Sequence, residues 1–301
     1  MKEKYETIKK IKKLKRSKKA IILAHVYQIG DVQDIADYTG DSLGLSREAA
    51  SADADVIVFC GVKFMAETAH LLNPAKTVLL PDKNAGCGLA DMATVDELIT
   101  WKKKYPNAAV VSYVNSSAAI KAESDICCTS SNAVAVVNSC PQDTILFLPD
   151  RNLGSYVAEH TDKNVISWNG FCYVHEKIKS RQIKKIKKTH PTAELIVHPE
   201  CTPTVRHMAN FIGSTSQMLQ YVIQSDQQEF IVGTEDNFVY RLQRDNPKKI
   251  FYPVNSSCRG MNYINLEKIK VSLEQSKYEI HLPKKIQSRA KKALDKMLRI
   301  K

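Results

Sequence analysis

Short apolar runs recur along the chain, separated by segments in which apolar residues follow a helical spacing. Residues 20–24 and 55–60 form the first two runs, and their Ile- and Val-rich composition is typical of buried strands. Helices are predicted nearby, over residues 31–38 and 43–52. The same order of strands and helices returns twice, with further strands predicted at 109–113, 144–148, 194–197 and 229–232.

One unit of this pattern occurs three times and ends in cysteine each time. Residues 77–87, 164–172 and 249–258 each contain a short apolar run followed by a turn rich in Asn, Gly or Ser. The closing residues are Cys87, Cys172 and Cys258, so the cysteines lie 85 and 86 residues apart. Spacing this regular over the whole chain predicts three similar modules.

The module boundaries follow from these cysteines. We predict a first α/β domain over residues 1–87, joined by C-terminal helices in 259–301, a second domain over 88–172 and a third over 173–258. Strands that alternate with helices form parallel sheets flanked by helices, and ligands bind beyond the carboxyl ends of their strands. The predicted fold is therefore α/β, with three similar domains arranged in pseudo-threefold symmetry around a central active site.

The positive charge is concentrated at the two ends of the chain. The net charge is +12, with +8 in residues 1–19 and +7 in residues 284–301, so the remainder sums to −3. We interpret both ends as solvated faces of terminal helices. Without an aromatic-interleaved basic groove, nucleic acid is not an expected partner. No apolar stretch approaches the ~20 residues that a membrane-spanning helix needs, and the N-terminus has no apolar signal core. We therefore expect no membrane association and a cytoplasmic location.

The three repeated cysteines are predicted metal ligands. The chain has eight cysteines and no C-x2-C pair, which argues against a local zinc finger and favours ligands supplied from distant segments. Iron–sulfur clusters are held by thiolates, and three ligands would leave one iron of a 4Fe–4S cluster open to substrate. The other five cysteines lack this register and are predicted packing or neighbouring residues: Cys60, Cys127, Cys128, Cys140 and Cys201.

Three hydroxyl-rich loops each precede a predicted helix. They are residues 41–42, 129–131 and 214–216. Ser and Thr are good helix N-caps, which is the structural interpretation. Free backbone N–H groups and hydroxyls at helix starts also bind anions, so three such loops near one cavity predict a substrate with several negative groups.

Acid–base groups follow the first strand of each module. A lone histidine after a strand is more often structural than catalytic, but equivalent positions in all three modules favour catalysis. A Glu near an open iron site is a candidate general acid or base, and a Tyr could relay its protons. The residues are His25, Tyr27, Tyr113, Asn115, His198 and Glu200.

Taken together, these motifs resemble the quinolinate synthase family, the A protein of bacterial and archaeal NAD biosynthesis. The resemblance runs from about Ile21 to Leu298. Its most specific segments are Leu23-Ala-His-Val-Tyr-Gln28, Gly40-Asp-Ser-Leu-Gly-Leu-Ser-Arg47, Ser112-Tyr-Val-Asn115, Cys128-Thr-Ser-Ser-Asn132, Gly170-Phe-Cys172, His198-Pro-Glu-Cys201 and Gly213-Ser-Thr-Ser216.

The resemblance implies a specific reaction and a specific set of site residues. The reaction is condensation of iminoaspartate (iminosuccinate) with dihydroxyacetone phosphate to quinolinate, with a 4Fe–4S cluster on Cys87, Cys172 and Cys258. Catalytic roles are implied for Glu200, Tyr27, His25 and His198. Substrate contacts are implied for His25, Ser42, Tyr113, Val114, Asn115, Ser130, His198, Pro199, Glu200 and Thr215.

Two other functions are compatible with the same residues. One is an iron–sulfur hydro-lyase acting on a hydroxy di- or tricarboxylate through the open iron. The other is an iron–sulfur nucleic-acid binder or redox sensor that uses the basic ends of the chain. For the leading hypothesis, the partners are the two small substrates and an aspartate oxidase that supplies iminoaspartate. The expected oligomeric state is a monomer or a homodimer.

Overall fold

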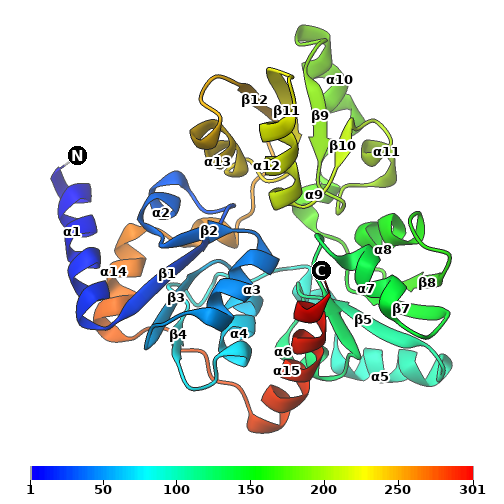
Figure 1. Cartoon of the computed structure of the whole chain (residues 1–301), viewed down its shortest axis with the longest axis horizontal. Coiled ribbons are helices and arrows are strands. Elements are labelled where there is room, and N and C mark those ends of the chain that lie inside the picture. The colour runs from blue at the N-terminus through cyan, green and yellow to red at the C-terminus, as the bar shows by residue number, and fades with distance from the viewer. Residues whose placement is uncertain (1, 301) are drawn as a thin grey trace.

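The computed structural model describes residues 2–300 and contains three four-stranded parallel sheets, each flanked by helices (Figure 1). The strand orders are β2-β1-β3-β4, β6-β5-β7-β8 and β10-β9-β11-β12. Across each sheet, the strands therefore follow the same order: second, first, third and fourth in the sequence of that module. The predicted α/β fold with three similar parallel-sheet domains is confirmed.

The first sheet is built from the N-terminal part of the chain. Its elements are α1 (Lys2–Ser17), β1 (Ala20–His25), α2 (Gly30–Ile35), β2 (Tyr38–Gly40), α3 (Ser42–Ser51), β3 (Val56–Cys60), α4 (Lys63–Leu72) and β4 (Thr77–Leu79). The predicted helix over 31–38 ends at Ile35, because Tyr38 begins the short edge strand β2, which pairs with β1.

The second and third sheets follow the same plan. The second contains α5 (Val95–Lys104), β5 (Ala109–Tyr113), α6 (Ala118–Ala122), β6 (Ile126–Cys128), α7 (Ala133–Ser139), β7 (Thr144–Leu148), α8 (Arg151–Ala158) and β8 (Asn164–Ser167). The third contains α9 (Tyr173–Glu176), α10 (Ser180–Thr189), β9 (Glu194–Val197), α11 (Pro203–Arg206), β10 (Phe211–Ile212), α12 (Thr215–Gln224), β11 (Glu229–Gly233), α13 (Phe238–Asp245) and β12 (Ile250–Pro253).

The central strands are held by burial on both faces. In the first sheet, β1 and β3 pair in parallel from Ala20 opposite Val56 to Ala24 opposite Cys60. Ile22 and Ile57 are fully buried. Burying one such side chain contributes about 1.5–3 kcal/mol, which explains why the continuous apolar runs mark these strands in the sequence.

The last two helices pack back onto earlier parts of the chain. Helix α14 (Leu266–Gln275) lies against α1 and β3, whereas α15 (Lys284–Arg299) lies against α6 and β6 of the second sheet and α4 of the first. The C-terminal segment therefore contacts two sheets. None of the helices in residues 2–300 is both long and apolar enough to cross a membrane.

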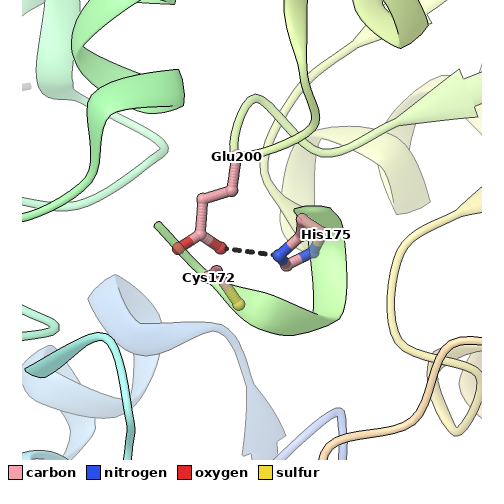
Figure 2. A group of neighbouring side chains, drawn as sticks. All are labelled: Cys172, His175 and Glu200. Carbon is pink, nitrogen blue, oxygen red and sulfur yellow. Dashed lines mark ion pairs between the residues drawn. The ribbon is translucent and has the colours of Figure 1, made fainter. Parts of the chain in front are cut away.

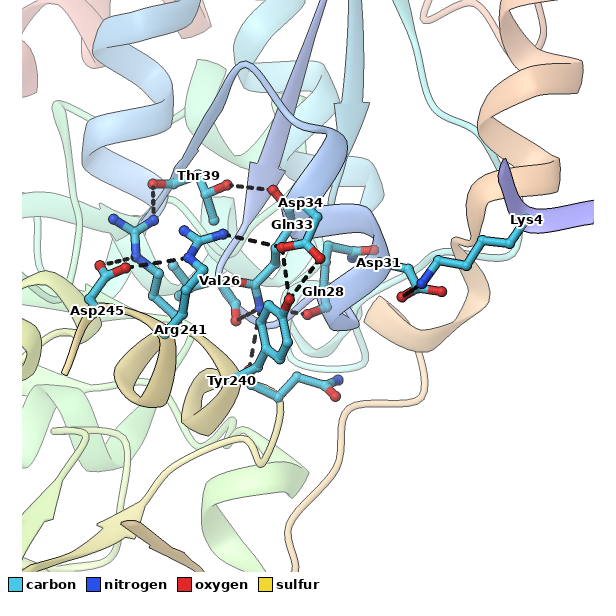
Figure 3. Close-up of polar contacts among 12 residues, drawn as sticks. Lys4, Val26, Gln28, Asp31, Gln33, Asp34, Thr39, Tyr240, Arg241 and Asp245 are labelled. Carbon is cyan, nitrogen blue, oxygen red and sulfur yellow. Dashed lines mark hydrogen bonds and ion pairs between the residues drawn. The ribbon is translucent and has the colours of Figure 1, made fainter. Parts of the chain in front are cut away.

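The first and third sheets also touch through polar contacts between α2–β2 and α13 (Figure 3). The Tyr240 hydroxyl donates to Asp34 at 2.7–2.8 Å, and Arg241 donates to the backbone oxygen of Thr39 at 3.2 Å. Gln33, on α2, donates to the backbone oxygens of Val26 and Gln28. These bonds hold the loop after β1 in place.

Candidate active site

The carboxyl ends of the strands in all three sheets converge on a cavity of about 650 Å³. Its wall includes twelve of the fourteen residues implied for substrate, catalysis or metal, with all three repeated cysteines among them. The lining residues from that set are His25, Tyr27, Ser42, Cys87, Tyr113, Asn115, Ser130, Cys172, His198, Glu200, Thr215 and Cys258.

Two of the implied site residues, Val114 and Pro199, do not line the cavity. Those two are next in sequence to the lining residues Tyr113 and His198, but they are not part of the wall formed by residues 2–300. Their contact with substrate stays a prediction.

The three repeated cysteines suit a shared inorganic centre. Cys87, Cys172 and Cys258 line the same cavity, each is partly exposed, and none is in a disulfide. Burial raises the pKa of the Cys87 thiol to about 12, so its thiolate needs a compensating positive centre such as a metal. The five cysteines outside the repeat are all buried, in agreement with a packing role.

A close backbone contact joins the loops of the first and third cysteines. At Gly260, a Cβ atom would lie 2.1 Å from the backbone oxygen of Gly86. Only glycine fits at that distance, so the loop after Cys258 can lie directly against the loop before Cys87.

Glu200 is the centre of a buried cluster of side chains next to Cys172 (Figure 2). Its Oε2 atom lies 3.1 Å from Nδ1 of His175 and 3.1 Å from Nδ1 of His198. Burial raises the pKa of the Glu200 carboxyl, but the attraction and hydrogen bonds of His175, and then of His198, outweigh it and lower the pKa below its usual range. The carboxylate is therefore ionised at neutral pH.

A chain of polar contacts extends from Glu200 in both directions. On one side, Oγ1 of Thr234 lies 2.9 Å from Nε2 of His175 and 2.5 Å from the hydroxyl of Tyr27. On the other side, Nε2 of His198 lies 3.1 Å from Oγ of Ser130. These distances allow protons to move between Tyr27 and Glu200 through side chains alone.

Sequence reasoning missed His175 and Thr234. Both are buried, and 59 residues separate them along the chain. The available signal was position: His175 lies three residues after Cys172, and Thr234 directly follows β11. Ligands bind at strand ends in parallel sheets, so Thr234 could have been included as a candidate. His175 could have been included because it lies close to Cys172 in the sequence.

Two buried oxygen atoms on the cavity wall have no partner within residues 2–300. They are Oε1 of Glu200 and Oδ1 of Asn115. Leaving a buried polar atom unsatisfied costs about 1–3 kcal/mol. Both atoms are therefore suited to accept hydrogen bonds from a bound substrate.

In the three hydroxyl-rich loops, some residues cap helices or join the loops, and others line the cavity. Asp41 accepts from the backbone N–H of Gly44 and Ser214 from that of Gln217, so both act as N-caps. Ser131 donates to Asp41 and contacts Ser214, each at 2.8 Å, which joins the three modules. The neighbouring residues on the cavity wall are Ser42, Ser130 and Thr215.

His25 and Tyr113 complete the wall as neutral groups. Burial lowers the pKa of His25 to about 4, although Asp41 opposes this shift. Burial likewise raises the pKa of Tyr113 well above its usual value, and Glu200 adds to the shift. At neutral pH, Tyr113 can donate a hydrogen bond and His25 is uncharged.

The strand ends of the three parallel sheets surround one cavity lined by thiols and acid–base groups. This arrangement is typical of an enzyme active site for small molecules. Comparison with known proteins specifies the family. A family model described as quinolinate synthetase A protein matches residues 9–299. Quinolinate synthase 2 of Methanosarcina acetivorans is 52% identical over 297 residues, which cover 98% of this chain and 95% of that protein.

Two further relatives agree. Quinolinate synthase of Dehalococcoides mccartyi is 50% identical over 293 residues, 97% of each chain. Quinolinate synthase of Thermodesulfovibrio yellowstonii is 48% identical over 295 residues, also 97% of each chain. The chain belongs to the quinolinate synthase family, and the resemblance identified in its motifs is confirmed.

Proposed function

We propose that this chain condenses iminoaspartate with dihydroxyacetone phosphate to give quinolinate, phosphate and two waters. The observation that carries the proposal is the convergence of Cys87, Cys172 and Cys258 with the Glu200 cluster on one cavity. The three thiolates would hold a 4Fe–4S cluster. When bound, this cluster would supply a Lewis acid, because three thiolates would leave one of its four irons without a cysteine ligand.

The side chains of the cavity perform the acid–base work of the proposed reaction. Glu200 is ionised and accepts a proton, while Tyr27 is protonated because burial raises its pKa well above the usual value. Thr234 and His175 connect the two groups. One residue pair can therefore remove a proton from a substrate carbon and return one to a leaving hydroxyl.

The hydroxyl and amide groups of the cavity fit the negative groups of the substrates. Ser42 and Thr215 stand at the first positions of α3 and α12, where helix N–H groups and the helix dipole favour anions. Ser130 adds a hydroxyl from the second module. We assign these three loops to the carboxylates and the phosphate without dividing them further.

The test is an anaerobic assay of the purified, cluster-loaded chain. Iminoaspartate formed in situ from oxaloacetate and ammonia is mixed with dihydroxyacetone phosphate, and the quinolinate and phosphate produced are measured. We expect the two products in equal amounts. Omitting oxaloacetate is the control. Turnover of a hydroxy di- or tricarboxylate without quinolinate formation would instead favour the hydro-lyase alternative.

The remaining expectations belong to the same proposal. We place the domain boundaries after residues 87, 172 and 258, with residues 259–301 joining the first domain. We expect a cytoplasmic monomer or homodimer that receives iminoaspartate from an aspartate oxidase. Size measurement in solution and co-purification with such an oxidase test these points.

A further inference from the structure

The three cysteine loops share one backbone contact. In each module, the residue two positions before the cysteine accepts a hydrogen bond through its backbone oxygen. The donor is the backbone N–H of the residue three positions after the third strand of the sheet. All three bonds are 2.8 Å long, and they join Lys63 to Ala85, Arg151 to Gly170 and Asp236 to Ser256.

The second and third loops have an additional contact that ends on the cysteine itself. The backbone N–H of Cys172 donates to Oδ2 of Asp150 at 3.0 Å. The backbone N–H of Cys258 donates to Oε1 of Glu235 at 3.1 Å. Asp150 and Glu235 are both 0% exposed, and each lies two residues after the third strand of its sheet.

The first module differs at the corresponding position. Val62 lies two residues after β3, has no acceptor side chain and forms no side-chain cap on α4. The nearby acid of that module, Asp82, is directed elsewhere: it accepts from the Asn84 N–H and pairs with Lys268 at 2.6 Å. In two of the three ligand loops, a buried acid thus accepts a hydrogen bond from the N–H of the cysteine itself. In the first loop, the buried acid Asp82 bonds to Asn84 instead of Cys87.

We propose that Asp150 and Glu235 are positioning residues that hold Cys172 and Cys258 ready to bind the cluster. A hydrogen bond to the cysteine's own N–H restricts the backbone from which the thiolate extends, so less freedom is lost when the metal binds. The inference rests on the proposed function, because it assigns these residues to the same cluster. It adds a difference among the three ligands. The backbone N–H groups of Cys172 and Cys258 are each held by a buried acid, whereas Cys87 lies on a loop without this restraint.

Each acid also supports local structure, so the experiment must separate two effects. Asp150 accepts from the Leu153 N–H at 2.8 Å and thereby caps α8. Asp150→Ser keeps a capping hydroxyl but has no second oxygen for Cys172. Glu235→Gln keeps the shape but has a single acceptor oxygen for the two backbone N–H groups, of Cys258 and Asn237, that the acid accepts from.

The measurement is cluster retention in the full chain. Iron and sulfide are counted per chain after anaerobic reconstitution, and the rate of cluster loss to an iron chelator is followed by absorbance. We expect both variants to lose the cluster about 10-fold faster than the unmodified chain. Asp82→Asn is the matched control, with an acid removed from the first loop, and its loss rate should not change.

The outcomes separate this inference from the proposed function. If the unmodified chain binds no cluster, the proposed function fails. If it binds one and both variants release it at the unmodified rate, the positioning role is wrong while the proposed function stands. Thermal unfolding of the cluster-free variants serves as the second readout, and faster release at unchanged unfolding temperature supports positioning.

Discussion

Charged side chains are buried and paired at the cavity, whereas on the two terminal helices α1 and α15 they are exposed to solvent. At the cavity, Glu200 and His198 are buried and within 3.1 Å of each other. On α1 and α15, lysines such as Lys12 and Lys292 are exposed to solvent, and the buried residues are apolar, for example Ile11 and Leu294. The net charge of +12 therefore describes the outer helices and says little about the site.

This difference determines how each region should respond to substitution. Buried polar groups that depend on one another cost several kcal/mol when one partner is removed, whereas exposed charges contribute about 0–1 kcal/mol. The predictions below test this contrast, from the cavity outward.

The largest effect is expected for Cys172→Ser. Serine has no thiolate, so the proposed cluster loses one of three ligands and quinolinate formation should fall below detection. Iron per chain and the visible spectrum give an independent measurement. Cys201→Ser, which changes a buried cysteine outside the repeat, is the control and should keep both. Full activity in Cys172→Ser would refute the ligand assignment.

Glu200→Gln should preserve the fold and reduce turnover by about 10²–10⁴-fold, because the amide cannot accept a proton. The rate is measured with saturating substrates, alongside the iron content, which should stay unchanged. A rate within threefold of the unmodified chain would remove Glu200 from the catalytic group.

Thr234→Val should have a smaller effect, of about 10–100-fold on turnover. Valine keeps the shape of the side chain but removes the oxygen that lies between Tyr27 and His175. Replacing Thr234 by Ser restores that oxygen and should recover most of the rate. If Val and Ser behave alike, the relay does not depend on this hydroxyl.

The buried His25 should make stability depend on pH. Its pKa is about 4 in the folded chain and about 6.5 when unfolded, so between these values only the unfolded state takes up a proton. The contribution to stability is complete above pH 6.5 and is lost as pH falls toward 4, by about 3 kcal/mol at most. Urea unfolding of the cluster-free chain at pH 7 and 4.5 should show a smaller loss for His25→Gln; equal losses would contradict this.

The smallest effect is expected on the outer helices. Lys12→Glu and Lys292→Glu exchange exposed charges and should change stability by less than about 0.5 kcal/mol. Turnover should also be unchanged. A large loss of activity in either variant would mean that the basic helices take part in function, as the nucleic-acid alternative requires.

Features that leave a local pattern in the sequence could be predicted from it. Buried central strands such as β5 and β7 appear as continuous apolar runs, and the three cysteine units share a spacing. The edge strands β2 and β10 have only three and two residues, too few to show a period. His175 and Thr234 were missed because their contact joins positions 59 residues apart. Their places after Cys172 and β11 made them candidates but did not indicate that they bind each other.

The walls of the cavity are drawn from positions as far apart as His25 and Tyr263. During synthesis, the N-terminal module emerges from the ribosome long before the segment that carries Cys258. A chain that ended before β12 would lack the part of the cavity wall that includes Cys258 and Tyr263. Cofactor insertion can therefore be completed only after the segment that carries Cys258 has been translated.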